Sequence, residues 1–137
     1  LVTPHLVDRV DGQAVAATKK RRVVSRSVSR QMLTMLRGVV LEGTGTEAAI
    51  PGYTVAGKTG TAAKIESNGR YSTSRYVASF VGLVPATKPR LVIMVMVDEP
   101  RGNIYGGVVA APAFREIARF NLQHLEVPPD APRTRKH

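Results

Sequence analysis

The 137-residue sequence contains no cysteine and no tryptophan, and its aromatic residues are limited to 4 Tyr and 3 Phe. The absence of cysteine excludes disulfide frameworks, cysteine-based zinc sites and thiol nucleophiles, but it leaves the cellular compartment open. The longest uninterrupted apolar run covers residues 91–97, which is far short of the roughly 20 residues that span a bilayer. The sequence starts at Leu1 with neither an initiator methionine nor a signal pattern, so we expect an upstream part of the same protein.

Negative charge is also scarce, because 20 Lys and Arg residues stand against 10 Asp and Glu residues and give a formal net charge of +10. Such a charge indicates attraction to anions. No nucleic-acid partner is expected, however, since the chain offers few aromatic surfaces on which bases could stack. The three histidines are scattered along the chain, so the sequence predicts no Ser/His/Asp triad. We likewise expect no metal and no cofactor.

The first residues have the pattern of a small hairpin. Residues 6–10 and 13–16 flank an Asp11-Gly12 pair, which is typical of a tight β-turn because glycine tolerates positive φ. The basic residues 19–22 follow, and four like charges are best interpreted as a solvated loop.

A helix is predicted after this loop. Ser27 or Ser29 can cap its first turn, and Gly43 is placed to end it as the C′ residue. Apolar residues recur at the helical period and predict one buried face. These residues are Met32, Leu36, Val39 and Val40.

Three strands are predicted over residues 53–63, 75–84 and 91–98, and their short connections indicate an antiparallel meander. The third strand is apolar at nearly every position, so we expect both of its faces to be covered. A closing helix is predicted over residues 110–122, with Pro112 in its first turn. Its sheet-facing stripe would be Phe114, Ile117, Ala118 and Leu122. The fold class is therefore α+β, an antiparallel sheet covered by helices.

One lysine lies in two overlapping motifs. Residues 52–59 match the P-loop pattern G-x-x-x-x-G-K-[ST], and the acidic residues 98–99 after an apolar strand fit a magnesium site in such a protein. A P-loop, however, needs a buried strand before its first glycine and a helix that begins at Lys58. Pro51 interrupts the preceding segment, and residues 59–61 favour a strand. The P-loop NTPase is therefore the less favoured alternative.

The same lysine begins Lys58-Thr59-Gly60-Thr61, which matches the K-T-G motif of penicillin-binding proteins and class A β-lactamases. On a strand, Gly60 would let a substrate backbone approach, and an exposed edge could pair with an extended peptide. Lys58 would supply a positive charge near a nucleophile, and the threonine hydroxyls could bind a terminal carboxylate. An ordinary edge strand with a solubilising lysine fits these four residues as well.

The surrounding sequence favours the K-T-G interpretation. From about Pro4 to Leu122, the chain closely resembles the C-terminal part of the transpeptidase domain of class B penicillin-binding proteins. The matching segments, in order, are residues 39–45, 52–62, 76–82, 98–100, 105–107 and 111–115. The segment from Ala63 to Tyr76 resembles the septal, cell-division type, although Ala63 stands where many such relatives have glutamine. The resemblance implies the penicillin-binding and serine β-lactamase-like transpeptidase fold.

The resemblance also implies roles for individual residues. Lys58 would belong to the hydrogen-bond network around a catalytic serine. The backbone N–H of Thr61 would form one arm of an oxyanion hole. The implied substrate-binding residues are Thr59, Gly60, Thr61, Tyr105 and Gly106.

At the level of the whole protein, the resemblance implies a periplasmic or extracytoplasmic D,D-transpeptidase that cross-links peptidoglycan stem peptides through an acyl-serine and binds β-lactam antibiotics. An N-terminal segment would anchor it to the cytoplasmic membrane, and divisome membrane proteins would be further partners. The +10 charge then fits the basic surface of an exported protein near anionic lipid and cell-wall polymer.

The nucleophile motif S-x-x-K and the motif S-x-N are both absent from the chain. We therefore expect residues 1–124 to be part of a transpeptidase domain that is inactive alone and is completed by an upstream segment with both motifs. Residues 125–137 would form a proline-rich and then basic tail. A non-catalytic peptidoglycan- or partner-binding module of the same fold is the alternative.

Overall fold

The computed structural model describes residues 9–14 and 20–131, and the chain divides into two units, Leu1–Gln31 and Met32–His137. In the first unit, strands β1 (Arg9–Val10) and β2 (Gln13–Ala14) pair in antiparallel fashion. Asp11 and Gly12 between them have φ values of 50° and 78°, as a type I′ turn requires. The predicted hairpin is thus confirmed over residues 9–14, while its outer residues lie outside the described part. Residues 20–22 of the basic loop are exposed.

Helix α1 (Arg26–Leu41) begins earlier than its sequence suggests. The hydroxyl of Ser25 accepts a hydrogen bond from the backbone N–H of Val28 at 3.2 Å, so Ser25 is the capping residue. The prediction of Ser27 or Ser29 is wrong, because each serine in this run has the same local preference and only the geometry selects one.

The end of α1 lies near the expected place but for another reason. Gly43 does not have the positive φ of a C′ glycine, and a Cβ there would lie 2.9 Å from Val39 Cα and Val39 O. Glycine is therefore required by close packing against the last helical turn. On the predicted apolar face, Val40 is buried, Leu36 and Val39 are half-buried, and Met32 is 46% exposed.

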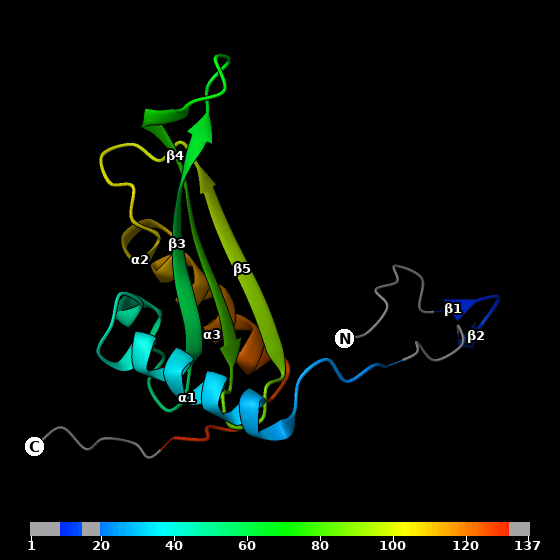
Figure 1. Cartoon of the computed structure of the whole chain (residues 1–137). Coiled ribbons are helices and arrows are strands. Elements are labelled where there is room, and N and C mark those ends of the chain that lie inside the picture. Colours follow the sequence, from blue (N-terminus) through cyan, green and yellow to red (C-terminus); the bar gives the residue numbers. More distant parts are fainter. Residues whose placement is uncertain (1–8, 15–19, 132–137) are drawn as a thin grey trace, which may run out of the picture. The chain divides into compact units, whose positions relative to one another are not determined.

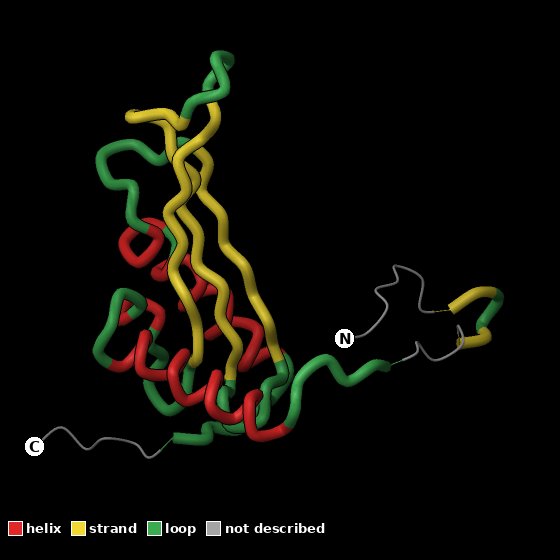
Figure 2. The backbone as a smooth tube through the Cα atoms, viewed as in Figure 1, coloured by secondary structure: helices red, strands yellow, loops and turns green. Residues whose placement is uncertain are grey.

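The second unit contains the sheet, in which β3 (Ala56–Ile65), β4 (Tyr71–Val84) and β5 (Leu91–Asp98) lie in the order β3-β4-β5. Both pairings are antiparallel, which confirms the predicted meander (Figures 1 and 2). The β3–β4 hairpin extends further than predicted, because β3 continues past a register shift between Ala63 and Ile65. The short helix η1 (Thr46–Ala48) follows α1, and α2 (Gly106–Val109) and α3 (Ala111–His124) follow the sheet.

One face of the sheet is covered by α2 and α3 (Figure 1). The rings of Phe80 and Phe114 meet edge to face in this layer, with centroids 4.9 Å apart, and both are fully buried. Gly57 leaves room for Phe80 and Gly82 leaves room for Phe114, since a Cβ at either glycine would lie 2.5 Å from a ring atom. Together these contacts form the core that fixes β3 beside β4.

The predicted sheet-facing stripe of the closing helix is confirmed except at one position. Phe114, Ala118 and Leu122 are fully buried, whereas Ile117 is 45% exposed. Pro112 lies in the first turn of α3, as predicted. The Ile117 prediction is wrong because the periodicity gave a wider apolar stripe than the part that packs on the sheet.

The opposite face of β5 is open, so the described residues do not supply the second cover that its apolar pattern predicts. Val92, Met94 and Met96 are 67%, 61% and 63% exposed, and within the described residues no element packs on them. The register places Val81 opposite Met94 and Lys58 opposite Val81. Lys58 therefore shares this open apolar face. In the described part of the chain, no helix has the length and apolarity to cross a membrane.

The segment after α3 returns to the start of β3. The hydroxyl of Tyr53 donates a hydrogen bond to the carbonyl of Val127 at 2.6 Å. The carboxylate of Asp130 accepts from the backbone N–H of Thr54 at 2.7 Å and from the hydroxyls of Thr54 and Thr87. Residues 127–130 thus fasten the entry of β3 to the β4–β5 turn, and the rest of the predicted basic tail lies outside the described residues.

The hydrogen bonds to the Asp130 carboxylate predict that the stability of the fold depends on pH. Burial alone would raise the pKa of the Asp130 carboxyl, but the hydrogen bonds from Thr54 and Thr87 together lower it. The ionised group therefore stabilises the fold above its unfolded pKa, about 3.9, and the contribution is lost as pH falls through the lower folded value. At pH 7, Asp130→Asn should reduce the free energy of unfolding by about 1–2 kcal/mol.

Denaturant titrations between pH 7 and pH 3 test this expectation. The difference between the native protein and Asp130→Asn should narrow below about pH 4, and Glu126→Gln provides an exposed control with little effect. A difference that is equal at pH 7 and pH 3 contradicts a role for the ionised carboxylate.

Candidate functional site

The motif Lys58-Thr59-Gly60-Thr61 lies within β3, which is the first strand of the sheet. One edge of β3 pairs with β4, and along the other edge the described residues provide no strand. Lys58 therefore lies within a strand and not at the start of a helix. This placement overturns the P-loop interpretation, because no helix amides surround the lysine.

The acidic pair that fitted a magnesium site has another role. Lys64 Nζ contacts the carboxylates of Asp98 at 3.0 Å and Glu99 at 2.8 Å. Hydrogen bonds to Glu99 and Asp98 raise the pKa of the lysine ammonium. Arg75 binds Glu66 and lowers the pKa of that carboxyl. These pairs link β3, β4 and the end of β5, and the described residues contain no group suited to hold a metal ion.

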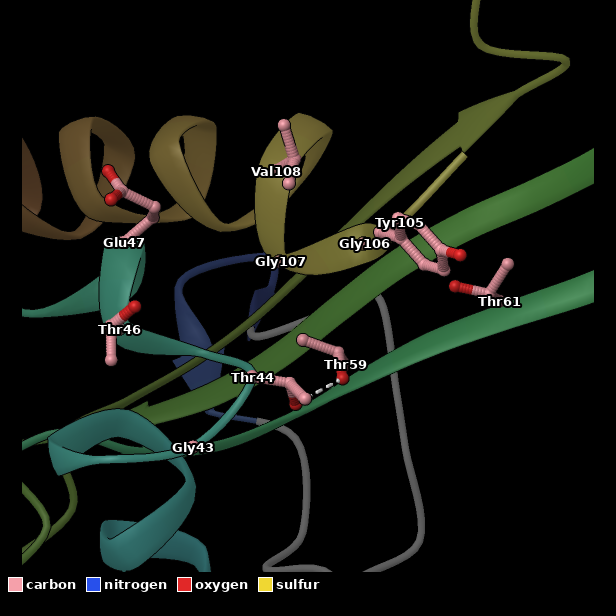
Figure 3. A pocket seen from close by; sticks show the side chains of 10 residues that line it. All are labelled: Gly43, Thr44, Thr46, Glu47, Thr59, Thr61, Tyr105, Gly106, Gly107 and Val108. Atoms are coloured by element: carbon pink, nitrogen blue, oxygen red, sulfur yellow. Dashed lines mark hydrogen bonds between the residues drawn. The ribbon is translucent and has the colours of Figure 1, made fainter. Parts of the chain in front are cut away.

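A pocket of about 400 Å³ opens beside the motif (Figure 3). Three segments form it, namely the loop and η1 after α1, strand β3, and the start of α2. Its lining residues are Gly43, Thr44, Thr46, Glu47, Thr59, Thr61, Tyr105, Gly106, Gly107 and Val108. The pocket therefore offers four threonine hydroxyls beside glycine-rich backbone.

The strand alternation divides the motif between two faces of the sheet. Thr59 and Thr61 pair with Phe80 and Ala78 on the helix-covered face, and both line the pocket with Tyr105 and Gly106. Lys58 and Gly60 alternate with them and do not line it. The pocket thus brings together four of the six predicted site residues, namely Thr59, Thr61, Tyr105 and Gly106. The other two, Lys58 and Gly60, lie on the opposite face of the sheet.

Hydrogen bonds connect the motif with its neighbours. Thr44 Oγ1 and Thr59 Oγ1 are 2.8 Å apart, and Lys58 Nζ donates to Thr59 O at 2.9 Å and to Thr59 Oγ1 at 3.2 Å. The hydroxyl of Thr61 donates to the carbonyl of Ile104 at 3.4 Å. The sequence-based site did not include Thr44. The segment 39–45 that contains it was part of the family resemblance and could have drawn attention to it.

The two glycines at the start of α2 allow the pocket walls to meet. A Cβ on Gly106 would lie 2.0 Å from the carbonyl oxygen of Ser79, and one on Gly107 would lie 2.1 Å from the carbonyl oxygen of Thr44. Both obstacles are backbone atoms that cannot move aside easily. Gly107 belongs to the matching segment 105–107, but the predicted substrate-binding residues in that segment were only Tyr105 and Gly106.

The K-T-G-T motif on an edge strand, in an antiparallel sheet backed by α3, is typical of the class of serine transpeptidases and β-lactamases. The profile of one family within that class, described as the penicillin binding protein transpeptidase domain, matches residues 1–119. The chain belongs to this family. Its fold is that of the transpeptidase domain, as the solved structures below also show.

Among curated relatives, stage V sporulation protein D of Bacillus subtilis is 42% identical over an alignment that covers 94% of this chain and 21% of that protein. Peptidoglycan D,D-transpeptidase FtsI of Escherichia coli is 41% identical, with 80% of this chain and 19% of that protein covered. Penicillin binding protein 3 of Mycobacterium tuberculosis, solved with ampicillin, has a TM-score of 0.78 and 36% identity, and the match covers 89% of this chain and 29% of that chain. This chain thus spans about a fifth of the length of these curated relatives.

Close packing at Gly107 gives a direct test of the pocket geometry. Gly107→Ala should lower the free energy of unfolding by about 1–3 kcal/mol, because its Cβ collides with backbone. Gly38→Ala is the matched control, since Gly38 lies within α1 with nothing within 4 Å of its Cβ position, and alanine favours a helix. Denaturant titration measures both variants. Equal stabilities for the two would contradict this packing.

Proposed function

We propose that the protein containing this chain is a peptidoglycan D,D-transpeptidase of the septal type, which cross-links stem peptides through an acyl-serine and is acylated by β-lactams. Family membership supports this proposal, as do relatives named peptidoglycan D,D-transpeptidases. Two related structures contain ampicillin and aztreonam. The single observation that carries the proposal is the exposed K-T-G-T strand beside a hydroxyl-lined pocket.

In this mechanism, an extended stem peptide pairs with the free edge of β3, and its backbone passes Gly60 closely. The hydroxyls of Thr59 and Thr61 bind the carboxylate of the peptide or of a β-lactam, and Tyr105 and Gly106 border the cleft. The backbone N–H of Thr61 donates to the oxyanion, a type of contact worth roughly 10²- to 10³-fold in rate. Lys58 supports the hydrogen-bond network of the nucleophile.

The nucleophile itself comes from outside this chain, because S-x-x-K and S-x-N are both missing from it. The open face that Lys58 shares with Val81 and Met94 is suited to receive that part of the protein. Apolar side chains there gain by being covered, at about 25 cal/mol per Å² of buried apolar surface. Packing on this face would also bring a serine from that part close to Lys58.

The same proposal places the protein on the extracytoplasmic side of the cytoplasmic membrane, held by an N-terminal anchor and associated with divisome membrane proteins. Its supporting observations are the septal-type relatives and the basic charge of +10. A non-catalytic peptidoglycan- or partner-binding module of the same fold is the second candidate. The upstream sequence separates the two candidates, since an S-x-x-K motif there rejects the second.

Labelling of the full-length protein with a fluorescent penicillin tests the proposed activity. The native protein should become covalently labelled, and Lys58→Ala should slow labelling on the order of 10²-fold, because the nucleophile loses its proton-transfer network. Lys88→Ala, which changes an exposed lysine in the β4–β5 turn, is the control and should label normally. Absence of labelling in the native protein, or label on a residue of 1–137, contradicts the proposal.

A further inference from the structure

The hydroxyl of Thr59 has a nearly complete set of hydrogen bonds before any ligand arrives. A threonine hydroxyl has one proton to donate and two lone pairs that can accept. Lys58 Nζ lies 3.2 Å from Thr59 Oγ1 and, as an ammonium, can only donate. One lone pair of Thr59 is therefore occupied by the lysine. The contact with Thr44 Oγ1 at 2.8 Å uses either the second lone pair or the proton.

The direction of this second bond decides what the pocket presents to an anion. If Thr59 donates to Thr44, its only proton is consumed and no donor remains for a ligand. If Thr44 donates to Thr59, the proton of Thr59 is free to point into the pocket. A carboxylate accepts hydrogen bonds and never donates when ionised. Its binding to Thr59 therefore requires Thr44 to act as the donor.

No cationic residue lines the pocket among the described residues, and the Lys58 ammonium reaches it only through Thr59, 3.2 Å from Thr59 Oγ1. Among the described residues that line it, Glu47 is the only charged one, and its carboxylate lies 3.6 Å from Arg115. Direct hydrogen bonds from the pocket lining to an anion must then come from hydroxyl and backbone donors, and Lys58 adds its positive charge from beside Thr59. When one hydroxyl accepts a hydrogen bond from one group and donates a hydrogen bond to another, the two bonds strengthen each other.

The position of Thr44 is fixed by backbone contacts. Its carbonyl oxygen packs against Gly107, where a Cβ would come within 2.1 Å, and the N–H of the next residue, Gly45, donates to Val39 O at 2.9 Å. Figure 3 shows the Thr44 and Thr59 side chains pointing toward each other from separate segments. The Thr44 hydroxyl is therefore held in place before a ligand binds.

We propose that Thr44 is a positioning residue for carboxylate recognition: it donates to Thr59 Oγ1 and so directs the proton of Thr59 toward the carboxylate of the substrate or β-lactam. This inference rests on the proposed function. It assigns Thr44 to ligand selection and not to the chemistry of acyl transfer. Its effect should therefore depend on the charge of the ligand.

Acylation of the full-length protein by a penicillin and by its methyl ester tests this role, because the ester lacks the anionic group. Thr44→Val should lower the ratio of the acid and ester rate constants by about 3- to 10-fold, the loss expected for one hydrogen bond. Thr44→Ser should keep the native ratio, since it restores the hydroxyl. Thr73→Val, on the exposed side of β4, should also keep it.

The outcomes separate this proposal from the proposed function. A native protein that reacts with penicillin, together with an unchanged acid-to-ester ratio in Thr44→Val, overturns the role of Thr44 alone. Equal losses for acid and ester also overturn it, because they indicate general damage to the pocket. A native protein that does not react with penicillin overturns both proposals.

Discussion

The site depends on the packing of one buried ring, that of Phe80. This ring meets Phe114 of α3 at a centroid distance of 4.9 Å, and it occupies space that side chains at three glycines, Gly45, Gly57 and Gly82, would fill. A Cβ at Gly57 would come within 2.5 Å of the ring, and one at Gly45 within 3.0 Å. Gly57 directly precedes Lys58, and Gly45 directly follows Thr44. The core contact that joins sheet and helix therefore also sets the positions of the two segments whose hydroxyls meet.

The same sheet separates two chemical tasks. Its helix-covered face carries the threonine hydroxyls that the pocket collects, and its open face carries Lys58 among apolar side chains. Alternation along a strand makes this division unavoidable, because successive residues point to opposite faces. Under the proposed function, carboxylate recognition is assembled within this chain and the nucleophile approaches from the open face. This proposal links the missing S-x-x-K motif to the uncovered apolar surface.

The local features of the fold could be predicted well from the sequence. Strand β5 has the predicted bounds, 91–98, since turn residues and a continuous apolar run define it locally. The start of α1 was missed because three nearby serines are equivalent caps until their geometry is known. The two covered faces expected for β5 are not both found within the described residues, because an apolar pattern shows that a surface prefers burial but not which segment buries it.

Six of the ten residues that line the pocket could not be predicted as site residues from the sequence. The motif indicated Thr59 and Thr61, but Thr44 joins them through a hydrogen bond between residues 15 positions apart. Likewise, the proline-rich stretch after α3 gave no sign that Asp130 would accept bonds from Thr54 and Thr87. Such contacts depend on the folded arrangement of distant segments, and a periodicity carries no information about them.

The most direct test is a crystal structure of the full-length protein after reaction with a carboxylate-bearing β-lactam. We expect the carboxylate to lie within hydrogen-bond distance, about 2.5–3.0 Å, of the hydroxyls of Thr59 and Thr61. The acyl group should be attached to a serine outside residues 1–137, on the side of the sheet that carries Lys58. A carboxylate bound away from these threonines, or an acylated residue within this chain, would contradict the account.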